Sequence, residues 1–174
     1  MASETPPPRK VELAHDPAFT KHAIEAIERF RKLCPSGQAP VLTILRVHLL
    51  TEYYIERILA MTLPRGDRLT GETNLSYAHK LTVLESLDVL DDQEVQSLRA
   101  LNKLRNSCAH EMDRQITLAD VELIGRPFGG EFTKLRRQLA NNVDDLLVKT
   151  LDKVAQSLTY HIWRIESRIA EEQE

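Results

Sequence analysis

The C-terminal part of the chain carries apolar residues at steps of three and four positions. The row consists of Leu135, Leu139, Val143, Leu147, Leu151, Val154, Leu158, Ile162, Ile165 and Ile169. Such steps place the side chains on one face of an α-helix, so the row predicts a long helix over 131–170 with an apolar seam. At ~1.5 Å per residue this helix would extend some 60 Å, which exceeds the width of a domain of this size. Either the helix is broken near Asn141-Asn142, or its end packs on another chain.

Shorter patterns of the same kind predict the remaining helices, and capping residues, proline and glycine mark their ends. We expect helices over 17–33, 39–61, 75–87 and 92–110, a helical turn near 118–124, and a polar loop over 64–73. The helix over 39–61 is apolar around most of its circumference, which indicates a central helix with several neighbours.

Composition supports the same fold class. Glycine is scarce, with 6 residues, and 42% of the chain is hydrophobic, which favours packed helices over a turn-rich β fold. We predict an all-α, up-and-down helical bundle of about five helices with a long C-terminal helix. The 174 residues correspond to one domain, 13–170, preceded by a flexible, proline-rich tail, 1–12.

Charge and cysteine usage exclude several classes of protein. The net charge of −3 rules out a histone-like nucleic-acid coat, although a local basic patch is compatible with it. Cys34 and Cys108 form neither a CxxC pair nor a zinc set, and without a signal peptide ahead of them they indicate reduced thiols in a cytoplasmic protein. No apolar run reaches the roughly 18 residues of a membrane span. We expect no cofactor, no metal and no membrane contact.

The most informative segment is Leu-Asn-Lys-Leu-Arg-Asn-Ser-Cys-Ala-His at 101–110. It holds Arg105 and Asn106, followed by His110, at the end of an amphipathic helix. By chance, the 174 residues would hold roughly half an Arg-His pair at any fixed spacing, so the spacing alone is weak evidence. The position of the pair at a helix end, before a charged loop, adds specificity.

This segment resembles the motif of the HEPN superfamily of small helical bundles, which has an arginine, a neighbouring polar residue, and a histidine after four to six intervening residues. The resemblance extends to the second helix and is most convincing over 40–112. It implies a homodimer whose two motifs meet in a cleft and, in many members, metal-independent endoribonuclease activity in toxins or antiviral effectors. Some toxins of the family carry a tyrosine two residues after the histidine, which an antitoxin modifies. Met112 occupies that position here, which argues against this form of control.

The chemistry of the residues agrees with the resemblance. His110 would act as general base or acid, Arg105 would clamp the phosphate and the transition state, and Asn106 would orient the phosphate or the imidazole. Five positions along a regular helix rotate a side chain by about 140° net, so Arg105 and His110 do not share a face. A working site requires the helix to end or distort at His110, or a second copy to complete the cleft. The expected partners are RNA, a second copy of the chain, and an antitoxin or other regulatory protein.

Other interpretations remain open. Relatives resembling the mannitol operon repressor share a Leu-Arg-Asn…Ala-His segment without clear nuclease activity, so a catalytically silent regulator acting through protein contacts is the main alternative. Arg105 and His110 would then only cap a helix C-terminus. A third interpretation, a purely structural dimerisation module, is supported only by the apolar seam of 135–169. Arg99 and Lys103 extend a phosphate-binding surface or form a solvated face.

A stripe of His48, Glu52 and Glu56 on the second helix could ligate a metal, but it lacks the paired Glu-x-x-His sets of metal-binding bundles. We expect it to border the cleft or to pair with Arg105 or Arg57.

Overall fold

The computed structural model describes residues 16–35, 37–71, 75–111, 113–139 and 141–173, and this part of the chain is helical, without strands. Its helices are α2 (Pro17–Leu33), α3 (Pro40–Thr62), α4 (Gly66–Gly71), α5 (Tyr77–Ser86), α6 (Asp92–His110), α7 (Leu118–Gly125), the 3₁₀ turn η1 (Arg126–Phe128), α8 (Gly130–Gln138) and α9 (Val143–Glu171). The all-α prediction is therefore confirmed for the described residues. The predicted tail, 1–12, lies outside them.

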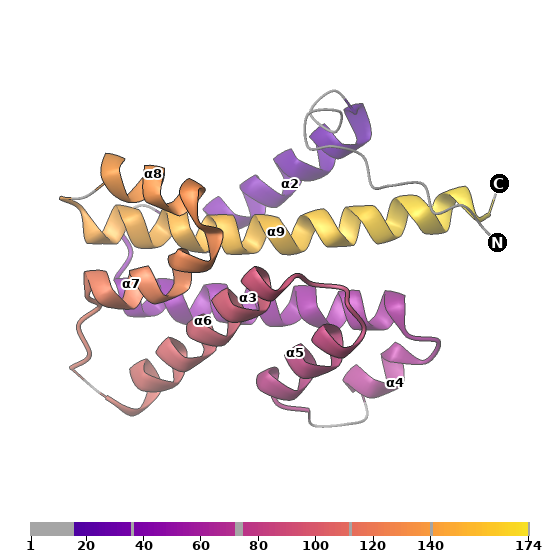
Figure 1. Ribbon diagram of the computed structural model, residues 1–174, viewed down its shortest axis with the longest axis horizontal. Coiled ribbons are helices and arrows are strands. Elements are labelled where there is room, and N and C mark those ends of the chain that lie inside the picture. The colour runs from indigo at the N-terminus through magenta and orange to yellow at the C-terminus, as the bar shows by residue number, and fades with distance from the viewer. Residues whose placement is uncertain (1–15, 36, 72–74, 112, 140, 174) are drawn as a thin grey trace.

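The long helices α3 and α9 organise the molecule (Figure 1). They run side by side in the same direction and make the most extensive helix–helix contact in the described structure. α2 packs on the other side of α9, and α5 and α6 pack on α3. α7 lies between α6 and α9 and contacts both helices.

Side-chain caps explain where several helices begin. The Asp16 carboxylate accepts hydrogen bonds from the backbone N–H groups of Ala18 and Phe19, as the Asp16-Pro17 pair predicts. At the start of α6, Asp91 and Glu94 form a reciprocal capping box. Because a cap side chain can bond the backbone only when the chain is not yet helical, each of these residues sets a boundary.

The core fills the space between α3, α6 and α9. Ile44, Ile55, Ile58 and Leu59 of α3 are fully buried, as are Leu98 and Leu101 of α6 and Leu146, Leu151 and Leu158 of α9. The prediction that the second helix is central is confirmed by this burial on several sides. One face of it stays exposed, however, with Leu49 at 63% and Tyr53 at 49% of full exposure.

A buried polar pair ties the start of α6 to α9. Glu94 is almost fully buried, and its carboxylate lies 2.8 Å from Nε2 of His161. The same carboxylate accepts the backbone N–H of Asp91 in the capping box. Glu94 thus satisfies two donors at once, which removes much of the cost of burying its charge.

Two details of the predicted arrangement change. The stretch over 64–73, expected as a loop, contains α4, which folds back on α3. Gly66 permits this turn, because a Cβ atom there would overlap the carbonyl oxygen of Leu59. The expected helix over 131–170 consists of α8 and α9, so the first of the two alternatives is correct. Asn142 caps α9 by accepting the N–H of Asp145, which explains the break.

The described residues form eight α-helices, against the predicted five or so. The two changes add α4 and α8, and the turn expected near 118–124 is the helix α7. None of the helices in the described part of the chain combines the length and the apolar character needed to cross a bilayer.

The α3–α9 contact predicts a large difference between two leucine truncations. Leu158→Ala removes a fully buried side chain and should lower the free energy of unfolding by about 2–5 kcal/mol. Leu123→Ala, at a side chain with 56% exposure, should change it by less than about 1 kcal/mol. Urea denaturation followed by circular dichroism measures both, and equal losses would contradict the placement of α9 in the core.

Candidate functional site

The predicted motif occupies the last turns of α6. This helix is regular to its end at His110, where the N–H of Glu111 bonds the carbonyl of Ser107 at 3.0 Å. The helix therefore ends after His110 without turning the His110 side chain toward Arg105. Because the helix is not distorted between the two residues, the rotation of about 140° between their side chains is retained.

A shallow groove of about 520 Å³ runs along one face of α6. It is lined by Arg99, Asn102, Lys103, Asn106, Ser107, His110 and Glu111, and by Ala78 of α5. The α6 residues recur at helical spacing, so one stripe of the helix forms the floor of the groove. Asn106 and His110 are both exposed there. The structure thus brings two of the three predicted site residues into one groove.

Arg105 lies beside this groove and is not among its lining residues. Its side chain is half-buried, and Nη1 donates a hydrogen bond to Oδ1 of Asn106 at 3.1 Å. This bond draws the guanidinium toward the groove on the Asn106 side. Arg105 and Asn106 are therefore in contact, whereas a single chain does not present Arg105 and His110 on the same face of α6.

The groove also carries basic side chains. Lys103 is exposed and has no ion-pair partner in the described part of the chain. Arg99 pairs with Glu85 of α5 at 2.6 Å, and both side chains remain substantially exposed. The only acidic residue among the lining residues is Glu111, which pairs with Arg114 at 3.3 Å. Asn106 and His110 are therefore surrounded mainly by donors and positive charge, which suits an anionic ligand.

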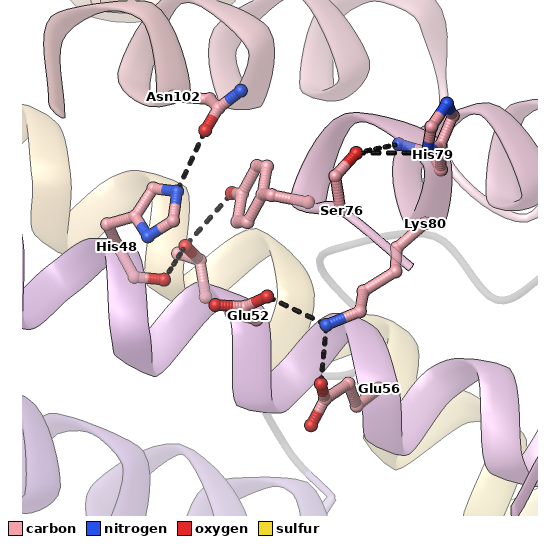
Figure 2. A network of polar contacts seen from close by, with 9 residues as sticks. His48, Glu52, Glu56, Ser76, His79, Lys80 and Asn102 are labelled. Atoms are coloured by element: carbon pink, nitrogen blue, oxygen red, sulfur yellow. Dashed lines mark hydrogen bonds and ion pairs between the residues drawn. The ribbon is translucent and has the colours of Figure 1, made fainter. Parts of the chain in front are cut away.

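A polar network lies behind the groove, between α3 and α6 (Figure 2). His48 of α3 lies 3.0 Å from Oδ1 of Asn102, and its ring stacks on Tyr77 with centroids 4.2 Å apart. The Tyr77 hydroxyl lies 3.0 Å from that of Thr51. Asn102 thus belongs both to the groove and to the network. Sequence reasoning missed it, although its position one turn before Asn106 is a usable signal.

The predicted pairing of the carboxylates on α3 with an arginine is wrong. Glu52 and Glu56 do not pair with Arg105 or Arg57, because Lys80 of α5 reaches between them, at 2.7 and 2.6 Å (Figure 2). Arg57 pairs instead with Glu166. Burial would lower the pKa of Lys80, but its hydrogen bonds to the two carboxylates outweigh this effect, and the pKa is raised.

The ammonium of Lys80 therefore occupies the space that a cation would need between Glu52 and Glu56. In the described residues, no set of three or more histidine, cysteine, aspartate and glutamate side chains is arranged to hold a metal ion.

The cysteines do not contribute a nucleophile to the groove. Cys108 does not line the groove and packs against the core, and burial raises the pKa of its thiol. Burial also raises the pKa of Cys34 to about 11. Both thiols are therefore held in the protonated, less reactive form.

A larger cavity of about 870 Å³ lies elsewhere, between α2, α9 and the start of α6. It contains none of the predicted site residues. The groove on α6 holds Asn106 and His110 and is therefore the candidate site.

Comparison of the chain with family models, with curated proteins and with solved structures finds no match. The resemblance to the HEPN superfamily thus remains a prediction from the sequence.

Protonation of His48 is expected to destabilise the fold. Burial lowers the pKa of His48 below its ordinary value of 6.5, with Arg105 and Lys80 acting in the same direction and Asn102 and Glu52 opposing. The unfolded chain then binds more protons, so the stability that neutral His48 provides is present above pH 6.5 and is lost as the pH falls below it.

Urea denaturation at several pH values tests this expectation. The free energy of unfolding of the wild type should decrease between about pH 7 and pH 5, and His48→Gln should reduce this decrease. The same pH dependence in both proteins would contradict the assignment.

Proposed function

We propose that this chain is a metal-independent endoribonuclease of the HEPN type, acting as a homodimer in bacterial defence or in a toxin–antitoxin system. The observation that carries the proposal is the exposed groove on α6, which holds Asn106, His110 and Lys103 next to the guanidinium of Arg105. Together these groups supply a proton acceptor, hydrogen-bond donors and positive charge. Cleavage of RNA without a metal requires these three kinds of group.

In the proposed reaction, the imidazole of His110 takes the proton of a ribose 2′-hydroxyl. The oxygen then attacks the adjacent phosphorus, and the bond to the 5′-oxygen of the next nucleotide breaks. That oxygen leaves with a proton that the imidazolium of the same His110 returns to it through a water molecule. The products are a 2′,3′-cyclic phosphate and a 5′-hydroxyl, so neither water nor a redox partner is consumed. Arg105 stabilises the charge on the phosphate oxygens.

The dimer enters the proposal for a geometric reason. On the regular helix α6, Arg105 and His110 point about 140° apart, so one chain does not aim both groups at one phosphate. A two-fold axis beside the end of α6 would set His110 of one copy opposite Arg105 of the other. Each dimer would then hold two equivalent sites, each built from both copies.

One observation favours the alternative, a catalytically silent regulator that acts through protein contacts. Arg105 is half-buried, does not line the groove, and already bonds Asn106. A guanidinium held in this way could serve to stabilise the end of α6. The two functions differ in whether the purified protein cuts RNA.

The nuclease proposal predicts cleavage of labelled single-stranded RNA by the purified protein in the presence of EDTA, with cyclic-phosphate ends. His110→Ala and Arg105→Ala should each lower the rate by at least about a hundredfold, because each removes a group that acts in the transition state. Lys149→Ala, at an exposed lysine of α9 away from the groove, is the control and should cleave normally.

Mixing the two inactive variants tests the shared site. If Arg105 and His110 act from different copies, half of the dimers in an exchanged mixture carry one intact site out of two, which restores about a quarter of the wild-type activity. A site within one chain gives no recovery. Absence of cleavage by the wild type, together with an unchanged fold and tight binding to a protein partner, would support the regulator.

A further inference from the structure

We infer that Asn102 is a further substrate-binding residue of the groove, holding phosphate oxygens of an RNA strand, and that His48 is the residue that positions it. This inference rests on the proposed function, because it names another contact to the same ligand. It concerns two residues outside the Arg-Asn…His motif.

The first step concerns the direction of the hydrogen bond between the two side chains. Oδ1 of Asn102 lies 3.0 Å from Nε2 of His48, and a carboxamide oxygen can only accept. Nε2 of His48 is therefore protonated and donates the hydrogen bond to Asn102. The bond occupies the oxygen of Asn102, so the amide nitrogen, with its two N–H groups, is the end left for other partners.

The second step concerns what those N–H groups face. Asn102 is half-buried and lines the groove together with Lys103, Asn106 and His110. Its amide nitrogen has no hydrogen-bond partner within the described ranges. A polar group that is oriented from behind and faces a basic groove is suited to donate to an anionic oxygen.

The third step explains why a histidine stands at position 48. The residue is 5% exposed, and its ring stacks on Tyr77 in the interior. Its Nδ1 is buried and has no hydrogen-bond partner in the described structure. A buried acceptor without a partner costs free energy, so a residue selected only for packing would be apolar. The hydrogen bond that the Nε2–H of His48 donates to Asn102 compensates for this cost.

Asn102 and His110 are eight positions apart on α6, or about 12 Å along the helix axis. Asn102 therefore contacts the strand beside the scissile phosphate and not the reacting atoms. An interaction of this kind is made equally in the bound and transition states, so its loss raises KM and leaves kcat nearly unchanged.

The test measures the binding of a single-stranded 2′-O-methyl RNA oligonucleotide by fluorescence anisotropy, since this RNA has no free 2′-hydroxyl and cannot be cleaved. We expect Asn102→Ala and His48→Leu each to raise Kd about tenfold. The first removes a donor to a charged group, and the second removes the N–H that holds this donor in place. His48→Gln, which keeps an N–H at the end of its side chain, should recover most of the wild-type affinity. Gln138→Ala, at an exposed amide on α8, is the control.

With cleavable RNA, Asn102→Ala should raise KM by the same factor at unchanged kcat. Wild-type affinity in Asn102→Ala, or equal affinities in His48→Leu and His48→Gln, would overturn the inference while leaving the nuclease proposal intact. If His48→Leu does not fold, Asn102→Ala alone decides. A wild-type protein that binds the oligonucleotide but cuts no RNA would refute the nuclease proposal only, and failure to bind any RNA would refute both.

Discussion

The packing of α3 against α9 is the contact on which the rest of the molecule depends. α3 uses its apolar residues for this contact and for the core with α6. Three of its polar side chains, His48, Glu52 and Glu56, face α5 and α6. One helix therefore forms the centre of the core and also supports the candidate site from behind.

Much of the fold was predictable, because its signals are local. Asp16 and Pro17 mark the start of α2, and the periodic leucines mark the buried faces of α6 and α9. The short helix α4 was missed, because nothing in its sequence shows that Gly66 lies against the backbone of α3. The break before α9 was foreseen only as one of two alternatives. Asn142 supplies the cap, but an asparagine in a periodic region does not by itself end a helix.

The candidate site was predicted in part. The motif lies at the end of α6, where Asn106 and His110 line one groove. The partners of the residues on α3 could not be deduced, because they depend on how α5 packs. Lys80 forms the ion pair with Glu52 that was predicted for an arginine. The contact between Asn102 and His48 joins two distant segments, so the sequence does not reveal it. Helical periodicity identifies the residues that share a face but not the residues that lie opposite.

The two ends of α6 are held very differently. At its start, Glu94 joins the capping box to His161 of α9, whereas no side chain after Leu104 is fully buried. Buried contacts therefore hold α6 as far as Leu104, whereas Asn106 and His110 present their side chains to solvent. A substitution at either of these two positions changes the chemistry of the groove without opening the core.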